Sequence, residues 1–197
     1  MPRTSLKDVR TQEILSAFTR CVARYGLDGS TLARISEEAG IARPLLRHYL
    51  GNREEMIQRL LDHVLSDFAT RTKTFFDMLP ATGRIDALIE ALFGRVDYSS
   101  ESAAVFAALV AASERHKEIR KPLLRFVYEF EDLIAAEIRA ENTSADPNLV
   151  DVAAAGITAI YFNTDAVMPL VPKEGWRDRQ RAAALVLLEA ACQSGRT

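Results

Sequence analysis

Apolar residues recur every three to four positions along almost the whole chain, and no segment shows sustained alternation of apolar and polar residues. The segment from 6 to 25, for example, places Ile14, Phe18 and Val22 on one stripe. The segment that follows residue 52 continues the same spacing with Met56 and Leu60. Because this is the period of an α-helix and not that of a β-strand, we predict an all-α fold.

Turn and capping residues divide the predicted helices. The predicted ranges are 6–25, 32–39, 43–50, a long helix that opens at 52, and then about 85–96, 101–116, 118–140, 147–168 and 176–192. A glycine follows each of the first three helices, where it can adopt a left-handed conformation. Asn52 with Glu55 forms a capping pair for the long helix, and Asp146 followed by Pro147 is a strong start signal for a later one.

Charge is distributed unevenly in this chain of 197 residues, which holds 25 Lys and Arg against 27 Asp and Glu. Residues 1–53 hold nine basic and five acidic residues, a net charge of +4, which leaves sixteen basic and twenty-two acidic residues for 54–197, a net charge of −6. Binding to the phosphates of a nucleic acid requires cations concentrated on one surface. The asymmetry is therefore a hint that the N-terminal quarter contacts nucleic acid.

Residues 31–53 carry the pattern of a helix-turn-helix, two short helices around a turn that contains a glycine. The side chains expected to pack the two helices together are small or apolar: Ile35, Ser36, Ala39, Ile41 and Leu46. The second helix would read DNA, because Arg43, Arg47 and His48 offer donors to base edges and Tyr49 offers one to phosphate. A solvated helix hairpin is the alternative, since arginines are common on short helices.

Residues 10–65 resemble the DNA-binding domain of the TetR family of transcriptional regulators. The matching residues are Tyr25-Gly26, Ser30-Thr31, Ile35, Ala39-Gly40-Ile41 and the run from His48 to Met56. The resemblance implies an all-α chain with an N-terminal helix-turn-helix three-helix domain at 1–53 and a helical effector-binding and dimerisation domain at 54–197. It implies a ligand-responsive regulator, with repression favoured, that binds palindromic operator DNA as a homodimer and is released by a small, largely apolar effector.

The resemblance also implies a set of DNA-binding residues: Thr31, Arg43, Pro44, Leu45, Arg47, His48, Tyr49 and Arg53. In this set Thr31 caps the second helix and faces phosphate, Tyr49 contacts phosphate, and Arg53 lies beside the start of the fourth helix. Leu45 and Arg47 depart from the family pattern, which often has Ser or Thr and an aromatic residue at these positions. We therefore expect a thymine-methyl contact from Leu45 and an additional guanine or phosphate contact from Arg47.

The helices after residue 54 are rich in aromatic residues, most of which we expect to be core. The candidates for lining an effector pocket are Phe93, Phe106, Tyr128, Phe162, Asn163 and Trp176. Small residues also cluster near Ala155 and near Ala184, where two subunits could approach closely and form a four-helix bundle. Packing of the same surfaces within one chain is the alternative.

An all-α enzyme and a helical adaptor without DNA binding are the rival functions. The three histidines, His48, His63 and His116, are scattered and form no metal-binding pair on a helix. The sequence contains no GxGxxG, GxxxxGK[ST] or GxSxG motif. We therefore expect no catalytic residues, no metal and no cofactor.

The N-terminal segment lacks the apolar core of a signal peptide, and no stretch of about 18 apolar residues could span a bilayer. Cys21 and Cys192 lie far apart in apolar stretches, as expected of buried thiols and not of metal ligands. These features predict a cytoplasmic protein that has no membrane partner.

Overall fold

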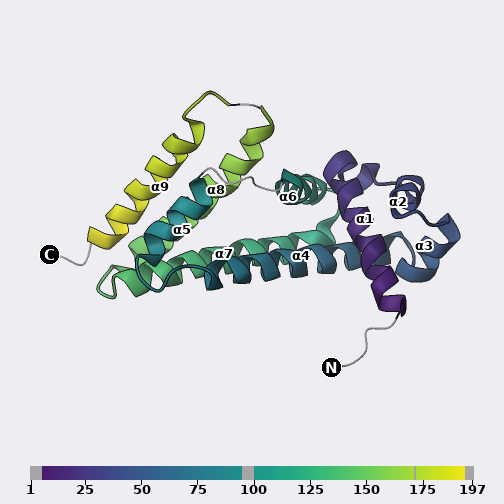
Figure 1. Ribbon diagram of the computed structural model, residues 1–197, viewed down its shortest axis with the longest axis horizontal. Helices are drawn as coiled ribbons and strands as arrows, with labels where there is room; N and C mark the ends of the chain where they lie inside the picture. Colours follow the sequence, from purple (N-terminus) through teal and green to yellow (C-terminus); the bar gives the residue numbers. More distant parts are fainter. Residues whose placement is uncertain (1–5, 95–99, 171, 194–197) are drawn as a thin grey trace. The chain divides into compact units, whose positions relative to one another are not determined.

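The computed structural model describes residues 6–94, 100–170 and 172–193. The α-helices are α1 (Leu6–Gly29), α2 (Leu32–Ala39), α3 (Arg43–Leu50), α4 (Arg53–Asp77), α5 (Arg84–Phe93), α6 (Ser100–Ala112), α7 (Arg120–Glu141), α8 (Pro147–Val167) and α9 (Trp176–Gln193), as labelled in Figure 1. Short 3₁₀ helices cover Lys117–Ile119 and Met168–Leu170. The described residues include no β-strand, which confirms the all-α prediction. No helix within these ranges is both long enough and apolar enough to cross a membrane.

The predicted caps are confirmed where the structure describes them. The backbone N–H of Asn52 donates to Oε2 of Glu55 at 2.8 Å, and the N–H of Glu55 donates back to Oδ1 of Asn52 at 3.0 Å. The N–H of Asn148 donates to the Asp146 carboxylate at 2.8 Å, with Pro147 as the first residue of α8. Each pair satisfies N–H groups that a helix terminus leaves without partners.

Two helix ends differ from the predicted ones. The helix predicted over 101–116 ends at Ala112, and turns lead from there to His116, whose φ of −108° and ψ of 80° are not helical. The helix predicted over 85–96 ends at Phe93, and Gly94 is extended. Gly26, predicted to end the first helix, has a φ of 70° and kinks α1 there, and α1 continues as one further turn to Gly29.

The chain forms two compact units, one of residues 1–70 with 99–123 and the other of 71–98 with 124–197. In the first unit α1 packs against α2, α3 and α6. Its core consists of buried side chains that include Ile14, Phe18, Ile35, Leu46, Leu50, Met56, Leu60 and Leu109. The contact of α6 with α1 joins α6 to this unit, which also contains the first part of α4.

In the second unit α9 packs against α8 and α5. Its core includes Leu88, Ile89, Phe93, Phe130, Ile134, Ile157, Tyr161, Ala184 and Leu188. Helices α8 and α9 approach closely at Gly156, where an added Cβ would lie 2.6 Å from Cδ1 of Leu187. Ala184, expected at a contact between subunits, is 0% exposed within its own chain, so the alternative of intrachain packing is the correct one for this residue.

Candidate nucleic-acid interface

Helix α3 is held in the first unit by one buried side. Leu46 and Leu50, four residues apart, are completely buried among the neighbouring helices. Pro44 lies in the first turn of α3, where a missing N–H is tolerated. The other positions of α3 include five exposed residues: Arg43, Pro44, Leu45, Arg47 and His48. The structure thus gathers five of the predicted DNA-binding residues on one accessible surface, and Leu45 is 44% exposed there.

The turn between α2 and α3 sets the orientation of α3. Gly40 has a φ of 61°, a left-handed conformation that glycine adopts without strain. The N–H of Ile41 donates to the Ser36 carbonyl at 3.1 Å, and the Ser36 hydroxyl donates to the Ile41 carbonyl. At the other end of α2, the Thr31 hydroxyl accepts from the N–H of Arg34 at 3.3 Å, so Thr31 is the cap and is exposed.

The cations of the N-terminal helices fall into two groups. Arg20 and Arg24 both donate to the carboxylate of Glu38, at 2.6 Å and 3.1 Å, so half of their combined charge is compensated locally. The guanidinium groups of Arg43 and Arg47 on α3, by contrast, form no hydrogen bond or ion pair with any described residue. Uncompensated positive charge is therefore present on the exposed side of α3, where it can attract phosphate.

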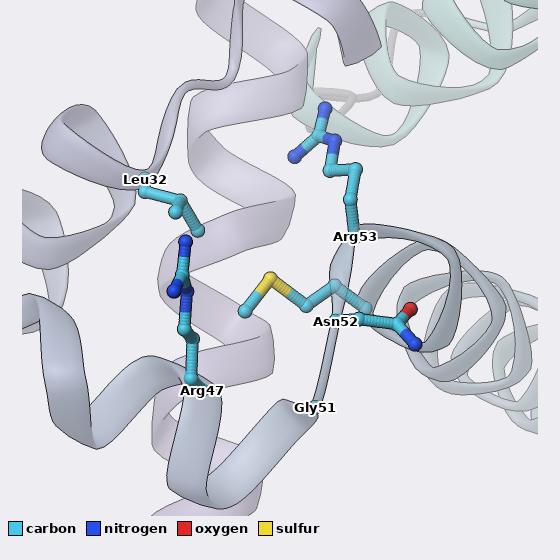
Figure 2. A pocket seen from close by; sticks show the side chains of 6 residues that line it. Leu32, Arg47, Gly51, Asn52 and Arg53 are labelled. Atoms are coloured by element: carbon cyan, nitrogen blue, oxygen red, sulfur yellow. The ribbon is translucent and has the colours of Figure 1, made fainter.

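A surface pocket of about 610 Å³ lies beside α3. Its lining residues are Leu32, Arg47, Gly51, Asn52, Arg53 and Met56. Figure 2 shows the Arg47 side chain extending from α3 toward Leu32, while Asn52 extends from the segment before α4. Leu32 and Asn52 are not among the predicted site residues. Each lies at the start of a helix, α2 or α4, and this position could have indicated from the sequence that they are near α3.

The last predicted residues of α3 form an aromatic pair. The rings of His48 and Tyr49 are 5.2 Å apart and nearly perpendicular, with an interplanar angle of 79°. His48 is exposed, and Tyr49 is half-buried. Packing of the two rings restricts the rotamers of the pair at the C-terminal end of α3.

Arg53 differs from the other predicted DNA-binding residues. Its Nη2 donates to the Leu27 carbonyl at 2.7 Å, and its Nη1 donates to the Ser30 carbonyl at 3.0 Å. Burial lowers the pKa of the guanidinium, and the Asp28 carboxylate partly opposes this effect. Two of its donors are thus directed at the last turn of α1 and at the residue that follows α1, an arrangement that sequence reasoning missed because the hydrogen bonds span 26 and 23 residues.

Two of the predicted effector-pocket residues belong to one aromatic cluster in the second unit. The rings of Phe93 and Tyr161 meet edge to face at 6.3 Å, and those of Tyr161 and Phe162 are 5.6 Å apart. Phe162 also stacks on Phe130 at 5.6 Å. Phe93 is buried and Phe162 is half-buried.

Three other predicted pocket residues lie elsewhere. Tyr128 is 55% exposed and Asn163 is also exposed, because each lies two residues from a buried aromatic residue and two helical positions are about 200° apart. Phe106 belongs to the other compact unit, where its ring is 6.4 Å from that of Phe68. Tyr128 and Asn163 thus lie outside the buried aromatic cluster, and a role for these three residues in an effector pocket stays a prediction.

Polar groups accompany the start of α9. Trp176 is half-buried, and its buried Nε1 has no hydrogen-bond partner among the described residues. Arg177 donates to the Asp165 carboxylate at 3.0 Å. Burial raises the pKa of Asp165, while Arg177 acts in the opposite direction. The second unit therefore contains, besides the aromatic cluster, a buried N–H of Trp176 that can still donate a hydrogen bond.

The three histidines take different environments. His48 is exposed on α3, His63 is half-buried on α4, and His116 is bonded to Asp28. Burial lowers the pKa of His63, and the Asp67 carboxylate opposes this. Within the described ranges, no group of three or more His, Cys, Asp and Glu side chains could hold a metal ion.

Comparison with known proteins connects this arrangement to a family. Residues 14–60, which include α2 and α3, match the model of bacterial regulatory proteins of the tetR family. The HTH-type transcriptional regulator BetI of Rhizobium meliloti (strain 1021) is 25% identical over 167 residues, which cover 82% of this chain and 81% of that protein. BetI of Vibrio vulnificus (strain YJ016) is 28% identical over 129 residues, and the match spans 64% of each chain, slightly less than two thirds.

Solved structures share the fold. A TetR transcription regulator from Haloarcula marismortui aligns with a TM-score of 0.75 at 15% identity, covering 94% of this chain and 99% of that one. A TetR-family transcriptional regulator from Cytophaga hutchinsonii aligns with a TM-score of 0.77 at 12% identity, covering 96% and 98%. Residues 14–60 therefore match the DNA-binding segment of the tetR family of bacterial regulatory proteins, and the chain as a whole is similar to transcriptional regulators of this family in sequence and in fold.

Proposed function

We propose that this chain is a ligand-responsive repressor that binds palindromic operator DNA as a homodimer and is released by a small, largely apolar effector. The observation that carries the proposal is the exposed side of α3, where Arg43 and Arg47 have no partner among the described residues. Guanidinium groups can bind guanine O6 and N7 or a phosphate, and the methyl groups of Leu45 can contact a thymine methyl. The set proposed to contact DNA is Thr31, Arg43, Pro44, Leu45, Arg47, His48 and Tyr49.

Dimerisation through α8 and α9 is supported by apolar residues on their exposed sides. Val152 on α8 is 61% exposed and Val186 on α9 is 65% exposed, and Ala155 on α8 is also exposed. An interface between identical chains would cover these side chains in both subunits. Two reader helices related by a two-fold axis require half-sites about 34–36 Å apart, which predicts a palindromic operator.

Effector binding is supported by the cluster of Phe93, Tyr161 and Phe162 together with the unpartnered N–H of Trp176. An apolar molecule with a hydrogen-bond acceptor would match these groups. The effector can shift DNA affinity only by its differential affinity for two conformations of the dimer, and coupling of this kind is typically about 1–3 kcal/mol. Operator DNA must then weaken effector binding by the same factor.

Unbiased selection of duplexes from a random DNA library tests the proposal. The wild type is expected to enrich a palindromic sequence, and the double variant R43A/R47A is expected to enrich none. The matched control is R139A in the second unit, which removes one exposed arginine that pairs with Asp151 and should leave the enriched sequence unchanged. If the wild type enriches no sequence, the protein is not a sequence-specific regulator and the helical adaptor becomes the better reading.

A further inference from the structure

We infer that Arg53 is a positioning residue that holds the turn between α1 and α2 in place for DNA binding and does not itself contact DNA. The inference rests on the proposed DNA-binding function and separates Arg53 from the residues assigned to that surface. Its evidence is the set of groups that surround the guanidinium in the first unit.

The guanidinium binds two backbone carbonyls where α1 ends, one in the last turn of α1 and one directly after the helix. Nη2 lies 2.7 Å from the Leu27 oxygen and Nη1 lies 3.0 Å from the Ser30 oxygen. Both Leu27 and Ser30 are buried, so water is a poor substitute donor for the protein group. The planar guanidinium has donors in fixed directions and can reach both oxygens at once, which a lysine ammonium cannot reproduce with the same geometry.

An aromatic ring and a carboxylate complete the surroundings of Arg53. Its Cζ lies 5.5 Å from the centroid of the Phe18 ring, and Phe18 is completely buried. The Asp28 carboxylate favours the charged guanidinium. A cation above an aromatic face is attracted by the negative centre of the ring. The side chain therefore joins the start of α4 to α1 and to the turn that follows it.

This turn determines where α2 begins. Ser30 donates its hydroxyl to the Gly26 carbonyl at 2.7 Å, and the next residue, Thr31, caps α2. Arg34 donates to the Gly29 carbonyl at 2.7 Å from the other side of the turn. The carbonyls of Leu27 and Ser30 are thus the points at which α4 fixes the entry to α2, and α2 in turn supports α3 through the Gly40 turn.

A role in binding phosphate would require Arg53 to leave both carbonyls. That movement would leave the buried Ser30 carbonyl without its donor and the Leu27 carbonyl with only the N–H of Ser30, at 3.3 Å. Leaving a buried acceptor without a donor costs free energy that would offset a phosphate contact. Arg47 can bind DNA without losing such bonds, because its guanidinium has no partner among the described residues. Both arginines line the same pocket, but only Arg53 would have to break hydrogen bonds within the protein in order to bind DNA.

Titration of the selected duplex at several salt concentrations distinguishes the two roles. For R53A and R53K we expect at least a tenfold loss of affinity with an unchanged slope of log K against log salt. For R47A, the matched control from the same pocket, we expect the slope to fall by about one if Arg47 binds phosphate. Wild-type affinity in R53K together with a slope reduced by about one in R53A would assign Arg53 to a phosphate and overturn the inference.

Amide hydrogen exchange without DNA provides an independent readout. We expect faster exchange at residues 27–31 in R53A and in R53K, and unchanged exchange in R47A. R53K keeps the test decisive if R53A does not fold. If the wild type binds no duplex, the proposed function fails while exchange still decides whether Arg53 holds the turn. If the wild type binds DNA and exchange at 27–31 is the same in all variants, the inference alone fails.

Discussion

Asp28 and His116 are separated by 88 positions in the chain, yet Oδ1 of Asp28 lies 2.7 Å from Nε2 of His116. The other carboxylate oxygen accepts a hydrogen bond from Nε of Arg115 at 2.7 Å. Both partners follow the end of α6, and Asp28 lies in the last turn of α1. These bonds connect the segment after α6 to the same turn that Arg53 holds, within one compact unit.

Acid should weaken this connection. The hydrogen bond from His116, followed by that from Arg115, lowers the pKa of Asp28, against a smaller opposing effect of burial. Because the folded-state pKa is lower than the unfolded one, ionised Asp28 stabilises the fold above about pH 4, and this contribution is lost as the pH falls through the folded-state pKa. Asp28 is partly exposed, so the contribution is at most about 1 kcal/mol.

Urea denaturation of D28N at several pH values measures this effect. We expect D28N to be less stable than the wild type at pH 6 and the difference to shrink as the pH falls below about 4. D132N, which changes an exposed carboxylate on α7, is the matched control and should follow the wild type throughout. A difference between D28N and the wild type that does not change with pH would show that Asp28 contributes nothing through its charge.

Arg47 should contribute directly to DNA affinity. R47A is expected to weaken binding to the selected operator by about 1–3 kcal/mol if the guanidinium reads a base, with the loss greatest for duplexes that keep the preferred base. Fluorescence anisotropy with the operator and with single-base variants of it measures both quantities. R139A in the second unit should bind as the wild type does. Equal affinity and equal salt dependence of R47A and the wild type would remove Arg47 from the interface.

Charged substitutions of two alanines should have different outcomes. Ala155 is exposed on α8, so A155E should keep its fold and yield a monomer if this surface joins two subunits. Ala184 is buried within its own chain, so A184E should instead lower stability by several kcal/mol, on the order of the cost of burying an unpaired charge. Light scattering and thermal denaturation distinguish these results. A dimer of unchanged mass in A155E would exclude this surface as the interface.

The two cysteines should react at different rates. Cys21 is almost completely buried in α1, and burial, with a further contribution from Glu38, raises the pKa of its thiol against the opposing effect of nearby arginines. Since the thiolate is the reactive form, Cys21 should be modified only after unfolding. Cys192 is half-buried and should react first. Mass spectrometry after a brief maleimide pulse, with and without urea, identifies the modified residue, and rapid native labelling of Cys21 would contradict the buried environment.

Local sequence features determined the helices of this protein. The ranges of α2 and α3 agree with the predicted 32–39 and 43–50, since the glycines and caps that end these helices act within a few residues. The reciprocal bonds of Asn52 and Glu55 likewise involve neighbours three positions apart. The exposed positions of α3 follow from the same local period, because burial of Leu46 and Leu50 leaves the opposite side to solvent.

Tertiary packing alone decided which partner each side chain meets. Arg53 lies next to the DNA-binding residues in the sequence, but its guanidinium binds carbonyls of a turn more than twenty residues earlier. Ala184 is small, as residues at close contacts between subunits often are. Helices α8 and α5 nevertheless pack against α9 and bury Ala184 within one chain. The apolar period determines which residues share a side of a helix. Which element packs against that side depends on how helices distant in the sequence pack together, and the local sequence pattern does not determine this.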